Sequence, residues 1–141
     1  MIHSPNRLLS TIFGIVLLLV GLFGFFLATP YPFATAEGGV LIGLFAANGF
    51  LSLIHVLLGA VLLLAGLGGV RPAKVFNILF GLGLVVFALV GFGIAHTGAN
   101  IFALNTPTIL LHLVVGLALL AAGLGADKVI LRAPSAAVAK A

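Results

Sequence analysis

Two histidines, His55 and His112, are the side chains of this sequence best suited to chemistry. Each lies within a long apolar segment that contains no Asp, Glu, Lys or Arg. An imidazole in such a segment can hydrogen bond to a neighbouring helix, bind a metal or a tetrapyrrole, or transfer a proton. The sequence has no cysteine, no nucleophile–base pair and no phosphate-binding loop. We therefore expect a protein that is not an enzyme.

Both histidines belong to a repeated pattern, Asn-x6-His-x3-Gly-x6-Gly, which occurs twice at one constant offset. The members of the two copies are Asn48, His55, Gly59 and Gly66, and then Asn105, His112, Gly116 and Gly123. Aligning residues 45–68 with residues 102–125 gives 12 identities in 24 positions. At about 100° per residue, the four members of each copy lie on one face of a helix. The sequence therefore predicts two equivalent helices that present the same residues.

The composition places these helices in a membrane. The chain is 63% hydrophobic and 6% charged, and its mean hydropathy is +1.44, which is too apolar for a soluble domain of this size. Apolar runs of about 20 residues match the thickness of the hydrocarbon core. We expect an all-α integral membrane protein with four transmembrane helices, at about residues 8–28, 50–69, 75–95 and 107–125.

The basic residues predict how these helices are oriented. All six precede the first helix, join the second to the third or follow the fourth: Arg7, Arg71, Lys74, Lys128, Arg132 and Lys140. The loops at about residues 29–48 and 96–106 contain no Lys or Arg. This distribution predicts that both termini are cytoplasmic. The net charge of +4 then describes a basic rim at the membrane, and we expect no nucleic-acid partner.

The first and third helices also resemble each other, with 6 identities over 14 positions when Phe13 is aligned with Phe80. The unit is thus a helical hairpin present twice in the same orientation, which predicts a parallel repeat with an axis along the membrane normal. We expect one transmembrane domain at residues 1–126, with halves at about 7–70 and 71–126, and a short cytoplasmic tail at 127–141.

The loops that precede the second and fourth helices are expected to contain apolar interfacial helices or re-entrant turns, at residues 38–47 and 99–104. Asn48 and Asn105 lie just before the predicted helices, where asparagine is a favoured N-cap. Pro107 suits the first turn of the fourth helix.

The repeated pattern allows several interpretations. In the structural one, the two faces form the interface between the halves, the glycines permit close helix packing, and each histidine hydrogen bonds to a neighbouring helix. In the alternative, His55 and His112 are axial ligands of haem or chlorophyll, and a nearby glycine makes room for the macrocycle. A zinc or copper site would have only two ligands. A proton pathway or pH sensor is a further possibility, although the helices lack carboxylates.

The duplicated pattern, which begins at Phe45 and Phe102, resembles that of a family of small four-helix bacterial membrane proteins known as a domain of unknown function. The resemblance covers about residues 7–126 and implies this topology in a bacterial cytoplasmic or photosynthetic membrane. We expect a non-enzymatic structural or accessory subunit whose partners are the lipid bilayer and a larger membrane complex or a second copy. No cofactor is firmly implied, and the alternative is a tetrapyrrole-binding protein.

Overall fold

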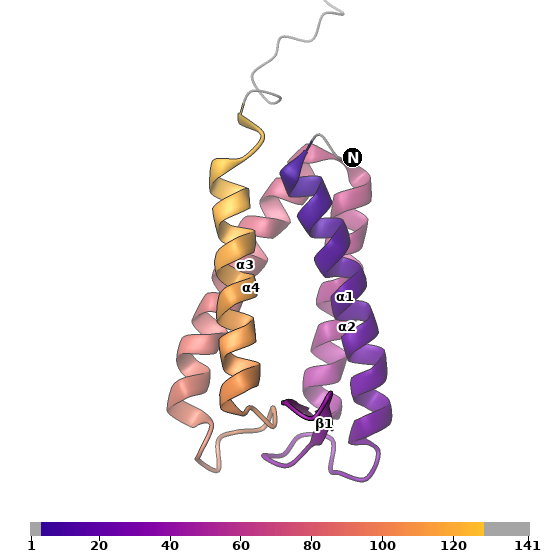
Figure 1. Ribbon diagram of the computed structural model, residues 1–141, viewed down its shortest axis with the longest axis vertical. Helices are drawn as coiled ribbons and strands as arrows, with labels where there is room; N and C mark the ends of the chain where they lie inside the picture. Colours follow the sequence, from indigo (N-terminus) through magenta and orange to yellow (C-terminus); the bar gives the residue numbers. More distant parts are fainter. Residues whose placement is uncertain (1–3, 129–141) are drawn as a thin grey trace, which may run out of the picture.

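The computed structural model describes residues 4–128, and within them it contains four α-helices and one two-stranded hairpin (Figure 1). In chain order the elements are α1 (Pro5–Ala28), β1 (Gly39–Leu41), β2 (Phe45–Ala47), α2 (Gly49–Gly68), α3 (Val70–Ile94) and α4 (Thr106–Gly125). Each helix is long and apolar enough to cross a membrane, which confirms the predicted fold class. Most of the expected tail, residues 129–141, lies outside the described part of the chain.

Helices α2 and α4, the second helix of each half, begin at the predicted N-caps. The side chain of Asn48 accepts a hydrogen bond from the backbone of Leu51, and the side chain of Asn105 accepts one from Thr108. Pro107 lies in the first turn of α4, as expected. These caps satisfy backbone donors that a helix start leaves free.

The third helix begins earlier than predicted, at Val70 instead of Val75. Gly69 alone separates α2 from α3, and its φ of 132° lies in a region that other residues rarely adopt. The predicted connection around Arg71 and Lys74 is therefore wrong, because both residues lie in the first two turns of α3. The positions of Arg71 and Lys74 in the sequence did not indicate that a one-residue turn at Gly69 comes before them.

The prediction of an interfacial helix or re-entrant turn at residues 38–47 is also wrong. This segment is an antiparallel hairpin in which Leu41 pairs with Phe45. Ile42 and Gly43 have φ values of 45° and 73°, and two successive positive values are typical of a hairpin turn. The equivalent segment, residues 99–104, is shorter and forms turns. The extra residues of the first loop therefore provide the hairpin.

The helices pack as two pairs, α1 with α2 and α3 with α4, as Figure 1 shows. A Cβ atom added to Gly59 would lie 2.6 Å from the backbone nitrogen of Leu18 in α1. A Cβ atom added to Gly116 would lie 2.9 Å from the backbone nitrogen of Val85 in α3. Leu18 and Val85 occupy equivalent positions when α1 is aligned with α3, so both halves use the same glycine contact. Such contacts let helix backbones approach closely.

This packing corrects the structural interpretation of the repeated pattern. All four glycines of the pattern face the other helix of their own half, and Gly66 and Gly123 lie against Thr11 and Ile78. The predicted glycine interface between the halves is therefore wrong. The histidines and asparagines do contact the other half, through the hydrogen bonds that these side chains make across the interface.

The asparagine caps also join the two halves at the end that contains the hairpin. Asn48 Nδ2 donates to the carbonyl of Ile101 at 2.8 Å, and Asn105 Nδ2 donates to the carbonyl of Leu44 at 2.9 Å. Leu44 and Ile101 are separated by the same offset as the two asparagines, so the two bonds are equivalent by the repeat. Each asparagine thus caps its own helix with its oxygen and bridges to the other half with its nitrogen, although Asn48 Nδ2 also donates to Thr35 of its own half.

Candidate functional site

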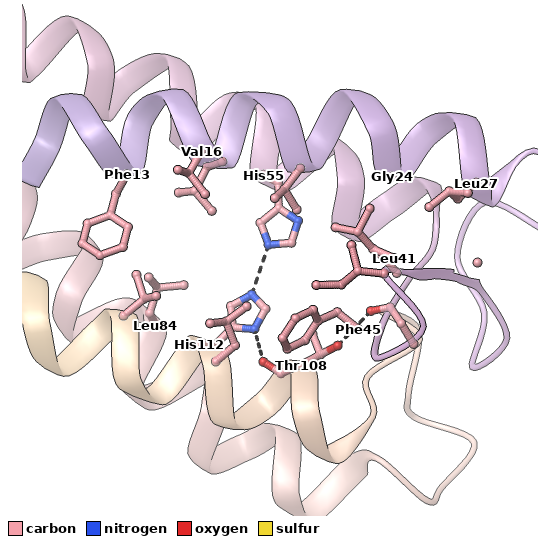
Figure 2. A pocket seen from close by; sticks show the side chains of 18 residues that line it. Phe13, Val16, Gly24, Leu27, Leu41, Phe45, His55, Leu84, Thr108 and His112 are labelled. Atoms are coloured by element: carbon pink, nitrogen blue, oxygen red, sulfur yellow. Dashed lines mark hydrogen bonds between the residues drawn. The ribbon is translucent and has the colours of Figure 1, made fainter.

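The two histidines of the repeat meet between the halves. His55 of α2 and His112 of α4 place their Nε2 atoms 3.2 Å apart, at hydrogen-bonding distance (Figure 2). The ring centroids are 5.3 Å apart and the ring planes differ by 18°. Because the centroids are farther apart than the nitrogens, the rings meet end to end. The predicted hydrogen bond to a neighbouring helix is present, and its partner is the other histidine.

The outer nitrogens of the two rings differ. His112 Nδ1 lies 2.6 Å from the carbonyl oxygen of Thr108, one turn earlier in α4. His55 Nδ1 is buried and has no hydrogen-bond partner among residues 4–128. Both residues are almost fully buried, with exposed fractions of 5% for His55 and 6% for His112. The sequence repeat makes the two positions equivalent, but the hydrogen bonds do not.

Two apolar cavities border the histidine pair. The first, the α1/α4 cavity, has a volume of about 240 Å³ and lies between α1, α4 and the β-hairpin (Figure 2). The second, the α2/α3 cavity, has a volume of about 250 Å³ and is lined by α2, α3 and Phe102 of the second loop, together with His112. Both cavities are lined by His55 and His112, and their other lining residues are almost all apolar. The pair is thus the shared polar part of their walls.

The two cavities are related by the repeat. Phe13 of α1 lines the α1/α4 cavity, and Phe80, its equivalent in α3, lines the α2/α3 cavity. In the same way Phe45 lines the first cavity, and Phe102, its equivalent in the second half, lines the second. The internal duplication therefore produced two similar spaces as well as two equivalent histidines.

Two substitutions within the repeat make the cavities unequal. Phe87 of α3 packs edge-on against the ring of His112, with centroids 5.2 Å apart, whereas the equivalent residue near His55 is the smaller Val20. Conversely, the α2/α3 cavity has Gly83 where the α1/α4 cavity has Val16. An aromatic side chain thus covers one histidine of the pair, while the other has a smaller neighbour.

The geometry argues against a tetrapyrrole held between these rings. Metal–imidazole bonds are about 2.0–2.1 Å long, so two axial imidazoles place their nitrogens about 4 Å apart. The observed distance of 3.2 Å is that of a hydrogen bond. Gly59 and Gly116 leave no room for a macrocycle either, because α1 and α3 occupy the space beside them. The described lining of both cavities contains no charged side chain that would pair with haem carboxylates.

A metal-ion site also lacks ligands. Within the described residues, no group of three or more His, Cys, Asp or Glu side chains lies close enough to hold a metal ion. The histidine pair supplies two ligands, whereas structural zinc sites use four.

The structure shows a second polar group that the sequence analysis missed. This terminal polar cluster lies where α1 begins and α4 ends, and its members are Ser4, Asn6, Ser10, Asn77 and Asp127. Asn77 Nδ2 donates to Asn6 Oδ1 at 2.9 Å, and Ser10 Oγ donates to Asn77 Oδ1 at 2.7 Å. Ser10 and Asn77 occupy equivalent positions when α1 is aligned with α3. Polar residues at equivalent positions of two apolar helices were the sign of this cluster in the sequence.

Asp127 connects the end of α4 to this cluster. Its Oδ2 accepts hydrogen bonds from Ser4 Oγ and Asn6 Nδ2, both at 2.8 Å. Burial raises the pKa of the Asp127 carboxyl, but these hydrogen bonds and the charge of Lys74 lower it more. The pKa therefore lies below its ordinary value, and the carboxylate is ionised at neutral pH.

Two basic side chains near the terminal polar cluster cap helix ends. Arg7 Nε donates to the carbonyl of Gly66 at the end of α2, at 2.9 Å. Lys74, the equivalent of Arg7 in the second half, donates to the carbonyl of Ala126 just after α4, at 3.3 Å. Positive groups are favourable at helix C-termini, where carbonyls lack partners. The basic rim that predicts orientation thus also stabilises the helix ends of each half.

Comparison with known proteins gives one match. The family model described as "Domain of unknown function (DUF4383)" matches residues 7–125, which confirms the resemblance stated above. No curated protein and no solved structure matches the chain.

Proposed function

Because this chain belongs to the DUF4383 family, whose description states no activity, we propose a function from the site itself. The protein is a non-enzymatic accessory protein of the membrane that holds a small lipophilic molecule beside its intramembrane histidine pair. The observation that supports this proposal most directly is the position of the pair, buried between two apolar cavities.

The cavity volumes fit a small ligand. An apolar cavity of about 150 Å³ is large enough to bind benzene, and the two cavities here measure about 240 and 250 Å³. Each therefore has room for a single ring with a short chain, and the rest of a longer molecule would extend into the lipid. Apolar lining with a few polar groups is typical of small-molecule sites.

The proposed orientation places the terminal polar cluster on the cytoplasmic side. Arg7, Arg71 and Lys74 lie at that end of the helices, and the positive-inside rule favours the cytoplasm for them. The β-hairpin and the histidine pair then lie toward the outer side. A ligand in this site would come from the bilayer, which agrees with an accessory role beside a larger membrane complex or a second copy.

The test uses the protein purified in mild detergent, from which bound compounds are extracted and identified by mass spectrometry. The double variant Val16→Phe/Gly83→Phe fills both cavities. Its matched control is Ile15→Phe/Gly93→Phe. Ile15 is adjacent to Val16 in α1, and Gly93 lies in α3 like Gly83 and also has open space beside it, but neither residue lines a cavity.

We expect a lipophilic compound that is retained by the control and lost from the filled variant. Equal recovery from both, or no enriched compound from the unmodified protein, would contradict the proposal. An absorption spectrum of the same sample tests the tetrapyrrole alternative, because a Soret band altered by His55→Leu or His112→Leu would identify a bound macrocycle.

A further inference from the structure

The histidine pair has more ring nitrogens than hydrogens to place on them. Two neutral imidazoles contain four nitrogens and two N–H groups. A neutral pair is expected in this apolar setting, because an unpaired buried charge is very costly. One hydrogen lies in the bond between the Nε2 atoms of His55 and His112. Only one hydrogen remains for the two outer nitrogens, so the pair must be asymmetric.

The structure determines where the second hydrogen lies. His112 Nδ1 is 2.6 Å from the carbonyl of Thr108, and a carbonyl only accepts, so His112 Nδ1 donates. His112 therefore accepts at Nε2, and His55 donates from Nε2. It follows that His55 Nδ1 has no hydrogen and presents a bare acceptor lone pair. That atom has no partner among the described residues.

A second polar atom without a partner lies on the same helix. The hydroxyl oxygen of Ser52, one turn before His55, is fully buried and has no hydrogen-bond partner within residues 4–128. Ser52 contacts Gly24 of α1, and Gly24 lines the α1/α4 cavity. The equivalent of Ser52 in the second half is Ile109, so this polar group has no counterpart beside His112.

The residues that line the two cavities also favour a ligand on the side of His55. Phe87 packs edge-on against His112, whereas Val20 is the equivalent residue on the side of His55. Figure 2 shows the second nitrogen of His55 on the side of the ring that faces away from His112. A ligand in the α1/α4 cavity thus meets Val20 where the other cavity has Phe87, and it lies beside the histidine whose outer nitrogen has no hydrogen-bond donor.

We propose that the ligand of the α1/α4 cavity is an apolar molecule with a hydroxyl group, which donates its hydrogen to His55 Nδ1. This inference rests on the proposed binding function and makes it specific. A buried acceptor without a donor is unfavourable, so a ligand that supplies the donor gains over one of equal size that does not. One such hydrogen bond corresponds to a preference of about tenfold.

The binding test compares two isomers, 4-propylphenol and 4-ethylanisole, which have the same atoms but only one of which has an O–H donor. Dissociation constants are measured by titration of the full chain in detergent. We expect 4-propylphenol to bind about tenfold more tightly to the unmodified protein than to the variant His55→Leu. The dissociation constant of 4-ethylanisole should be the same for both proteins. His112→Leu is expected to keep the preference, because it leaves His55 and its Nδ1 acceptor in place. The double variant His55→Leu/His112→Leu removes every ring acceptor and is expected to lose the preference as His55→Leu does.

The outcomes separate this inference from the function on which it rests. If both isomers bind with a ratio that His55→Leu leaves unchanged, the hydroxyl inference is wrong and the binding function stands. If neither isomer binds to the unmodified protein, both fail. Loss of the preference in His112→Leu but not in His55→Leu would show that the acceptor is on His112, and this result would also overturn the inference.

A measurement on the unmodified protein guards against variants that do not fold. Long-range nitrogen–proton correlation NMR of ¹⁵N-histidine protein reports which ring nitrogen has the hydrogen. We expect His112 in the Nδ1–H form and His55 in the Nε2–H form, with the His55 Nδ1 signal changed by 4-propylphenol and not by 4-ethylanisole. The reverse assignment, or the same tautomer in both rings, would disprove the proposal.

Discussion

Contacts within each half and contacts between the halves are built from different residues. Within a half, glycines such as Gly59 and Gly116 bring helix backbones together without intervening side chains. Between the halves, buried leucines such as Leu62 and Leu119 pack together, and the polar contacts include two asparagine bridges at one end, the histidine pair in the middle and the terminal polar cluster at the other end. The cavities lie between the halves as well. Tight packing thus forms the units, and the looser interface between them provides the site.

The largest expected effect comes from breaking the packing within one half. In Gly116→Leu, the new Cβ atom would lie 2.9 Å from backbone atoms of both Gly81 and Val85, and a helix backbone yields little. Overpacking costs about 1–3 kcal/mol and occasionally more, and we expect at least the upper end here. The measurement is the yield of monodisperse protein and its thermal midpoint in detergent.

The control for this variant is Gly125→Leu in the same helix, where a Cβ atom meets nothing within 4 Å. It should fold like the unmodified protein. If Gly116→Leu were as stable as Gly125→Leu, close glycine contact would not be what holds α3 against α4.

The next largest effect is expected at the terminal polar cluster, in the variant Asn77→Leu. The change removes the donor to Asn6 Oδ1 and the closer of the two acceptors of the Ser10 hydroxyl, whose other acceptor is the Ala73 carbonyl at 3.4 Å; Ser10 and Asn6 are both fully buried. Leaving buried polar groups unsatisfied costs about 1–3 kcal/mol. The double variant Ser10→Ala/Asn77→Leu removes the hydroxyl that has lost its closer acceptor and should recover part of the loss, as measured by a double-mutant cycle of unfolding free energies. A purely additive result would show that these two side chains do not act together.

A smaller effect is expected from acid. The folded state lowers the pKa of Asp127 below its ordinary value of 3.8. Its contribution to stability is therefore complete above this value and is lost as the pH falls through the lowered folded pKa. Thermal midpoints of the unmodified protein should decrease below about pH 4 by a few degrees at most, because solvent screens this partly exposed group. The variant Asp127→Asn should show a weaker decrease, and an identical pH profile would contradict the assignment.

The sequence predicted those features that depend on local chemistry or on the repeat. Apolar length indicated the helices, and the side chains of Asn48 and Asn105 indicated the caps, because a cap forms within one turn of chain. The equal offset of His55 and His112 indicated that they are equivalent. The hairpin at residues 38–47 was missed because its apolar residues also suit an interfacial helix, and only the turn geometry distinguishes the two.

The site itself depended on packing that periodicity does not reveal. One helix face contains both His55 and Gly59, and the sequence alone did not show that these residues contact different neighbours. The two cavities arise from side-chain size across four helices, such as Val20 at the position equivalent to Phe87, and no single segment encodes them. The asymmetry of the pair depends on a hydrogen position, which follows only from the distance between His112 Nδ1 and the carbonyl of Thr108.

The smallest expected effect distinguishes the two cavities. Gly83 lines the α2/α3 cavity, and a Cβ atom there meets nothing within 4 Å, so we expect the side chain of Gly83→Phe to enter that space. Because we place the ligand in the α1/α4 cavity, Gly83→Phe should change the dissociation constant of 4-propylphenol by less than about twofold, as should the control Gly93→Phe. Val16→Phe, at the equivalent position in the α1/α4 cavity, should weaken binding about tenfold or more, which corresponds to about 1.4 kcal/mol. If Gly83→Phe weakens binding as much as Val16→Phe, the ligand occupies both cavities and the difference between the two histidines does not select one side.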